Sequence, residues 1–131
     1  MTDKRKAQNP EFYVRPILYV SDVSLSTAYY CEKLGFQKDW GDDVFAQLSI
    51  HELELLIGCA KALDMPKSRS TISVSMHVPS KLNVLYENLI RSGAQIVNPP
   101  REVDWQKATY ELSLEDLDGN VLLFWAAMGD T

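Results

Sequence analysis

Hydrophobic and polar positions along the chain follow the same order of periodicities twice. The first block predicts a strand, a helix and three strands, over 10–20, 23–34, 36–40, 44–49 and 52–57. The second block predicts the same series, over 72–78, 82–90, 94–97, 109–114 and 121–125. A long loop over 98–107 is expected within the second block. The chain is therefore expected to contain two βαβββ modules, one over about 11–58 and one over about 71–127.

The ends of the predicted helices support a duplication. Ser21 and Asp22 offer side chains that cap a helix start, and a glycine follows each predicted helix, where a left-handed residue is favoured. These glycines, Gly35 and Gly93, lie 58 positions apart, as do Val20 and Val78, so one offset aligns the two halves.

One module alone leaves a face of its small sheet exposed, so the two modules are expected to pair in a single domain. The predicted fold class is α+β: two tandem βαβββ modules whose strands form a curved antiparallel or mixed sheet cup with the helices outside. The concave face of such a cup is the expected ligand site.

Composition narrows the classes of partner. The 131 residues are 46% hydrophobic and 24% charged, as in an ordinary globular domain. A net charge of −5 argues against nucleic acid and favours a cationic ligand, although an acidic surface is more often a solubility device. Two cysteines are too few for a disulfide framework, and no apolar run is long enough to span a bilayer. A cytoplasmic protein that binds neither nucleic acid nor a membrane is expected.

Five short motifs in order resemble the vicinal oxygen chelate superfamily, which includes glyoxalase I, extradiol dioxygenases, fosfomycin resistance enzymes and bleomycin resistance proteins. The motifs are PILYVSDV at 16–23, YY at 29–30 with LGF at 34–36, SGA at 92–94, NPP at 98–100 and EDLDGN at 115–120. The resemblance covers residues 14–127 and implies paired modules that form a cup, usually in a dimer. It also implies that the catalytic members bind a divalent metal through two residues from each module.

The four positions that the resemblance assigns to metal ligands are Arg15, Glu54, Ser73 and Leu123. A guanidinium stays protonated, an alkyl chain has no lone pair, and a neutral hydroxyl is a weak ligand, so Glu54 is the one good donor. The chelating chemistry is therefore expected to be absent. The alternative is that His77, on the same strand face as Ser73, replaces a missing donor and works with Glu54.

Strand alternation also predicts which residues line the cup. The expected ligand-binding residues on the inner face are Arg15, Tyr19, Glu54, Ser73, His77, Leu123 and Trp125. Trp40 near a turn and Trp105 in the long loop are candidate pocket walls or dimer contacts. Two structural alternatives stay open: the apolar members are core residues, and Arg15 with Glu54 forms an ion pair.

The leading hypothesis is a metal-free protein that sequesters an antibiotic-type, cationic aromatic small molecule, has no catalytic residues or cofactor, and resembles the bleomycin resistance proteins. A homodimer is expected, and Pro10 and Pro16 are compatible either with a segment that reaches a neighbouring subunit or with a simple bend. The alternative is a metal-dependent glyoxalase, lyase, isomerase or dioxygenase that uses Glu54, His77 and one divalent metal. A third possibility is a cup filled by side chains, which leaves a scaffold or partner-binding module.

Overall fold

The fold consists of two four-stranded sheets and two helices. The computed structural model describes residues 12–76, 78–103 and 109–127. The elements are β1 (Ile17–Val20), α2 (Val23–Leu34), β2 (Gln37–Gly41), β3 (Phe45–Ile50), β4 (Leu53–Cys59), β5 (Thr71–Ser75), α3 (Pro79–Ser92), β6 (Gln95–Val103), β7 (Thr109–Glu115) and β8 (Val121–Ala127). The strand orders are β1-β4-β3-β2 and β5-β8-β7-β6. In each sheet one outer pair is parallel and the other two pairs are antiparallel. The predicted α+β class with two βαβββ modules is confirmed.

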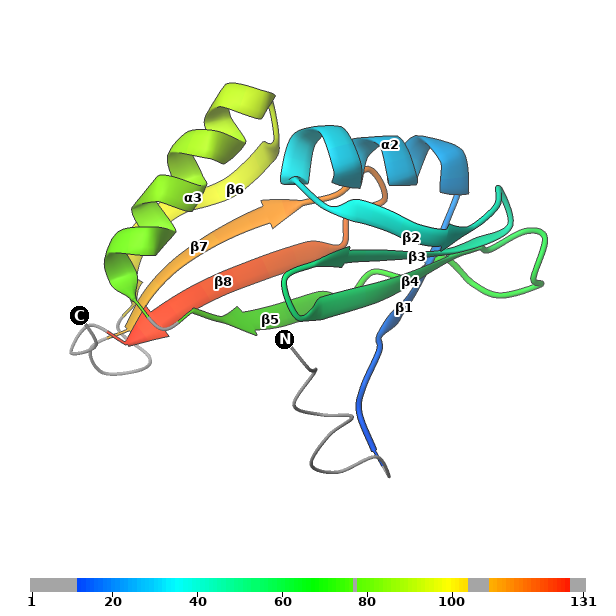
Figure 1. Ribbon diagram of the computed structural model, residues 1–131, viewed down its shortest axis with the longest axis horizontal. Coiled ribbons are helices and arrows are strands. Elements are labelled where there is room, and N and C mark those ends of the chain that lie inside the picture. The colour runs from blue at the N-terminus through cyan, green and yellow to red at the C-terminus, as the bar shows by residue number, and fades with distance from the viewer. Residues whose placement is uncertain (1–11, 77, 104–108, 128–131) are drawn as a thin grey trace.

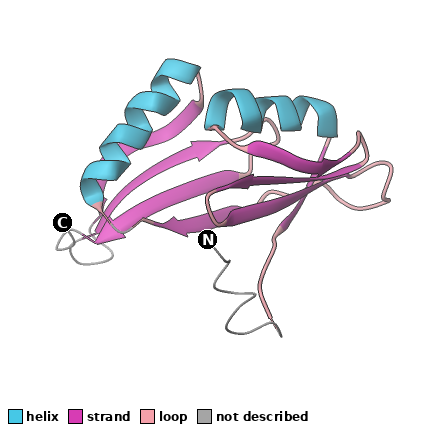
Figure 2. Ribbon diagram, in the orientation of Figure 1, coloured by secondary structure: helices cyan, strands magenta, loops and turns pink. Residues whose placement is uncertain are grey.

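Both helices lie over the same side of the two sheets (Figures 1 and 2). Residues that alternate toward the helices, such as Leu18, Leu55 and Leu122, form one hydrophobic core together with Tyr30 from α2 and Leu89 from α3. We call the side of the sheets turned away from the helices the open face. Among the described residues no helix or strand covers it (Figure 1). Neither helix in this part of the chain has the length and apolar composition needed to cross a membrane.

Local signals account for the helix limits. The Asp22 side chain accepts a hydrogen bond from the backbone N–H of Leu25 at 2.9 Å and so caps the start of α2. Gly35 and Gly93 end the two helices with φ of +83° and +86°, a left-handed conformation that costs glycine little. The prediction of a helix over 23–34 is confirmed. The second helix begins earlier than its apolar stripe indicated, because Pro79 is favourable in a first turn.

The first predicted strand is shorter than expected. The hydrophobic pattern favoured a strand over 10–20, whereas β1 begins at Ile17 and the described residues before it leave the sheet (Figure 1). Pro16 has no N–H to donate, although its carbonyl oxygen accepts a hydrogen bond from Leu56 N at 2.9 Å. In the second module β5 ends at Ser75, before the predicted end at Val78.

The predicted loop over 98–107 is wrong in its first half. β6 continues through Pro99 and Pro100 to Val103, well beyond the expected end at Val97. Prolines fit here because β6 is an edge strand, and its pairing with β7 shifts register on both sides of Asn98. Residues 104–108 lie outside the described residues.

The turn between β7 and β8 joins the second module to α2 through the buried carboxylate of Asp116. Its Oδ1 accepts the backbone N–H groups of Asp118 and Asn120, both at 2.9 Å. Its Oδ2 accepts the Tyr30 hydroxyl at 2.8 Å and the Asn120 side-chain amide at 3.0 Å. Burial and the neighbouring Asp116 charge raise the pKa of Tyr30, so its hydroxyl stays protonated and remains a donor. We call Tyr30, Asp116, Asp118 and Asn120 the module clamp.

Two further side chains, those of Tyr29 and Ser21, support the module clamp. The Tyr29 hydroxyl donates to the carbonyl oxygen of Glu115 at 2.8 Å and accepts the N–H of Gln95 at 2.9 Å. The Ser21 hydroxyl donates to Asp118 Oδ1 at 2.8 Å. The motif at 115–120 therefore holds the two modules together.

Candidate functional site

The residues at the four implied metal positions divide between the two sheets. Arg15 lies two residues before the start of β1 and Glu54 lies in the adjacent β4, whereas Ser73 in β5 pairs directly with Leu123 in β8. The strand neighbours of Glu54, Ser73 and Leu123 point into the core, so these three residues are directed to the open face.

Arg15 belongs to a chain of polar side chains on the first sheet. Its Nη1 donates to Oε1 of Gln47 at 2.8 Å, and Nε2 of Gln47 donates to Oδ2 of Asp39 at 3.0 Å. The hydroxyl of Ser49 and the side-chain amide of Gln37 both donate to Asp39 Oδ1, at 2.9 and 3.0 Å. Gln47 and Ser49 are buried, which makes these hydrogen bonds costly to lose.

A bulge in β2 brings Asp39 to the end of this row of hydrogen-bonded side chains. The pairing of β2 with β3 shifts register between Lys38 and Trp40, which directs Asp39 toward the side chains on β3. Slight burial raises the pKa of Asp39, but the hydrogen bonds from Gln47, Gln37 and Ser49 outweigh it and lower the pKa overall. The carboxylate therefore stays ionised to lower pH than an ordinary aspartate and orients the amide that holds Arg15.

On the second sheet the predicted residues contact one another. The indole Nε1 of Trp125 donates to the hydroxyl of Ser73 at 2.9 Å. Leu123 lies half-buried beside Ser113 on β7, whose hydroxyl accepts a hydrogen bond from the side-chain amide of Asn98 at 3.2 Å. The second sheet thus presents an aromatic and polar surface in which Ser73 already accepts a hydrogen bond.

A carboxylate that the sequence analysis missed lies next to Trp125. Glu111 on β7 is the direct cross-strand partner of Trp125 and is only 5% exposed. Nη2 of Arg101, on the edge strand β6, lies 3.5 Å from Glu111 Oε1. The signal was present in the sequence, because Glu111 and Ser113 alternate with the core residues Leu112 and Leu114.

Aromatic side chains gather at one end of the first sheet. A Cβ atom at Gly58 would lie 2.9 Å from Cδ1 of Leu63 and 3.2 Å from Cδ1 of both Phe45 and Tyr19, so these side chains cover this glycine. The ring of Trp40 stacks at a tilt on Phe45, with centroids 6.1 Å apart. Tyr19 and Trp40, both predicted ligand residues, therefore pack near the same cluster.

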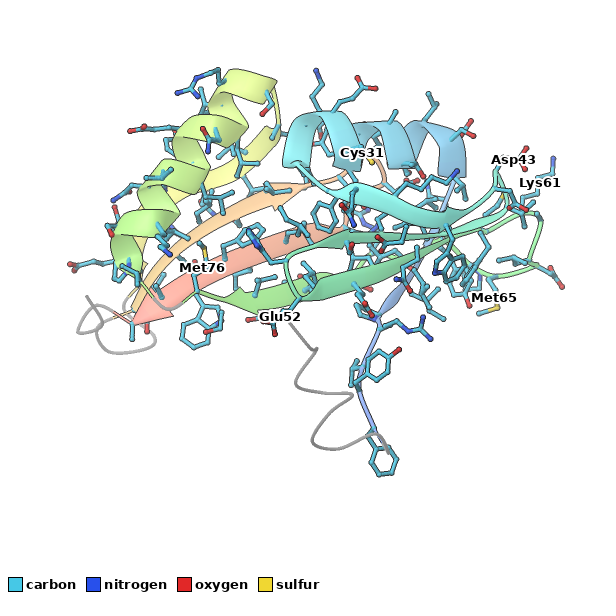
Figure 3. All side chains as sticks on the ribbon, in the orientation of Figure 1. Cys31, Asp43, Glu52, Lys61, Met65 and Met76 are labelled. Carbon is cyan, nitrogen blue, oxygen red and sulfur yellow. The ribbon has the colours of Figure 1, made fainter. Side chains whose placement is uncertain are left out.

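A shallow groove lies on the other side of the first sheet, between α2 and β2. It has a volume of about 300 Å³ and is lined by Ser24, Thr27, Ala28, Lys38, Asp42 and Asp43. Asp42 accepts the backbone N–H groups of Val44 and Phe45, and these two hydrogen bonds lower the pKa of its carboxyl. Figure 3 labels Asp43 at this end of the sheet, on the right of the view. Asp42 therefore shapes the turn before β3, and the groove that Asp42 and Asp43 line lies on the side of α2, away from the open face.

The residues at the implied metal positions do not fit a divalent metal. Arg15 is a cation that donates to Gln47, Ser73 accepts a hydrogen bond from Trp125, and Leu123 has no donor atom. Within residues 12–76, 78–103 and 109–127, no group of three or more His, Cys, Asp or Glu side chains is arranged to hold a metal ion. His77 and Trp105, the remaining predicted site residues, lie outside these ranges.

The chain belongs to the Glyoxalase/Bleomycin resistance protein/Dioxygenase superfamily, whose family model matches residues 13–124. No curated protein matches the chain. Among solved structures, a glyoxalase/bleomycin resistance protein/dioxygenase from Nocardioides is similar, with a TM-score of 0.73, 19% identity, and 94% of this chain and 91% of that chain covered.

Two further structures share the fold. A protein of the same description from Alicyclobacillus acidocaldarius has a TM-score of 0.72, 15% identity, and coverage of 92% of this chain and 94% of that chain. A glyoxalase-related enzyme from Fulvimarina pelagi has a TM-score of 0.67 and 15% identity, and 87% of each chain is covered. At these identities the likeness establishes the fold alone.

Proposed function

We propose that the protein binds a small molecule on the open face and acts by sequestration, without a metal and without a chemical reaction, in the manner of the bleomycin resistance proteins. The observation that carries the proposal is that Arg15, Ser73 and Leu123 replace three of the four implied metal donors, and that the first two are already hydrogen-bonded. The free thiols Cys31 and Cys59 support a reducing, cytoplasmic location.

The proposed ligand is a flat, cationic aromatic molecule of antibiotic type. The half-buried rings of Tyr19 and Trp125 supply surfaces for stacking, and the carboxylates of Glu54 and Glu111 supply negative charge. His77, Trp105 and Trp40 stay in the proposed ligand-binding set on the strength of the sequence pattern.

Titration with bleomycin-type and other cationic aromatic compounds tests this proposal. We expect quenching of tryptophan fluorescence and, at a ligand concentration one hundred times Kd, a stabilisation of about 2.7 kcal/mol seen as a higher melting temperature. If none of these compounds changes either signal, the cationic aromatic ligand class is wrong.

Elemental analysis of the purified protein tests the absence of metal chemistry. Stoichiometric nickel, manganese, iron or zinc that is lost in both Glu54→Ala and His77→Ala would contradict sequestration and support the metal-dependent enzyme instead. Glu52→Ala is the matched control, because it removes a carboxylate in the turn before β4. It should leave the metal content unchanged.

We also propose a homodimer in which the segment before β1 contacts a second copy. Phe12 and Val14 are 80% and 83% exposed on an extended segment that leaves its own sheet (Figure 1). Replacing both with serine should weaken self-association about tenfold or more, as removal of central apolar contacts does. Sedimentation analysis measures the change, and Leu25→Ser on the exposed side of α2 is the control. A monomeric wild-type protein would contradict the proposal.

A further inference from the structure

The ion pair between Glu111 and Arg101 is asymmetric in its exposure to water. The Glu111 side chain is 6% exposed, whereas that of Arg101 is 54% exposed. Their nitrogen and oxygen atoms are 3.5 Å apart, longer than the roughly 2.7–2.9 Å of a strong charge-assisted hydrogen bond. The carboxylate is therefore largely desolvated, while its partner remains well hydrated and makes a long contact.

The position of this ion pair would allow a cationic ligand to take the place of Arg101 beside Glu111. A desolvated carboxylate is costly without a positive partner, so Glu111 needs a cation whether or not a ligand is present. Trp125 is the cross-strand neighbour of Glu111, and their side chains share the open face. A ligand that carries a positive charge on an aromatic ring can meet the carboxylate and the indole together.

We propose that Arg101 is a placeholder cation: it neutralises Glu111 in the free protein and is displaced by the cationic group of the ligand, whose ring lies against Trp125. This inference rests on the proposed small-molecule function and adds the residue pair that selects for positive charge. Arg101 lies on an edge strand whose register shifts next to it, so its side chain can turn to solvent while the β6–β7 ladder is retained. A neutral ligand of the same shape cannot replace Arg101, because it would leave Glu111 unpaired.

Two dyes with the same ring system test the exchange: N-methylacridinium, a fixed cation, and acridine, which is neutral at about pH 8. We expect the wild-type protein to bind N-methylacridinium about tenfold more tightly than acridine, and Glu111→Gln to abolish this preference. Arg101→Gln should raise the affinity for N-methylacridinium roughly three- to tenfold and leave that for acridine unchanged, because the competing cation is gone. Fluorescence titration and equilibrium dialysis measure the affinity of each variant for both dyes.

Two further variants isolate the effect. The Glu111→Gln/Arg101→Gln double variant should match Glu111→Gln alone, since Arg101 acts only through the carboxylate. Arg91→Gln, on α3 and bonded to Asn88, removes an equal charge elsewhere and should change neither affinity. Without dye, Arg101→Gln should melt at a lower temperature than wild type, and N-methylacridinium should raise its melting temperature more than it raises that of wild type.

The outcomes separate this inference from the proposed function. If the wild-type protein binds both dyes equally, or if Arg101→Gln leaves the affinity for the cation unchanged or lowers it, the placeholder role is overturned while small-molecule binding stands. If neither dye binds, the placeholder role and the cationic aromatic ligand class are both overturned.

Discussion

Asp116→Ala is expected to lower the free energy of unfolding by about 3–5 kcal/mol, because it removes the acceptor of four hydrogen bonds inside the module clamp. Tyr30 and Asn120 are fully buried, so the donors that faced the carboxylate lose their partner in a place where water does not replace it. For a domain whose total stability is typically about 5–15 kcal/mol, such a loss is a large fraction of the whole. Urea denaturation followed by tryptophan fluorescence measures it.

Two controls show whether the cost comes from the clamp. Tyr30→Phe removes one hydrogen bond but leaves Asp116 with Asn120 and Asp118, so a loss of about 1–2 kcal/mol is expected. Asp43→Ala removes a carboxylate from the exposed β2–β3 turn and should stay within about 0.5 kcal/mol of wild type. An Asp116→Ala protein as stable as Asp43→Ala would show that the modules do not depend on this turn.

Gly41→Ala is the second substitution with a large expected effect. Gly41 ends β2 with φ of +120°, and a Cβ atom there would lie 2.3 Å from the backbone oxygen of Phe45 and 2.4 Å from Cα of Ala46. These are backbone atoms of the paired strand, so the hairpin between β2 and β3 must open to admit the methyl group. Backbone strain and overpacking together are expected to cost about 2–6 kcal/mol, again measured by urea denaturation.

Gly35→Ala is the matched control for backbone conformation without a clash. Gly35 also has positive φ, at +83°, but the nearest atom to an added Cβ is Cδ1 of Ile50 at 3.7 Å, an ordinary contact. Its cost should be limited to about 1–2 kcal/mol from the left-handed conformation. Equal losses for the two variants would mean that the close approach at Gly41 relaxes without consequence.

Sequence patterns located most elements because the signals that fix them are local. Asp22 and Gly35 set the limits of α2 within a few residues of themselves, so no knowledge of distant contacts was needed. The same reasoning failed at Pro99 and Pro100, where a local rule favoured a loop. The position of β6 at the edge of a sheet is a non-local property, and it is what allows two prolines within a strand.

The candidate site was predicted in part for a similar reason. Alternation placed Ser73 on β5, and Leu123 and Trp125 on β8, on the strand faces that point away from the core, since the period of two is a property of each strand itself. It did not identify Asp39, because a bulge at that residue interrupts the period. It also could not show that Glu111 faces Trp125, because that pairing depends on the register between β7 and β8.

The sequence by itself determined the order of the elements, the duplication into two modules and the absence of donor atoms at Arg15 and Leu123, because each is a property of residue type and short-range spacing. Only the tertiary structure decided that Asp116 joins the modules through Tyr30, that Gln47 links Arg15 to Asp39, and that Arg101 neutralises Glu111. The members of each such set lie on different strands or helices, and they meet only when burial of the apolar faces fixes the packing of the sheets and helices.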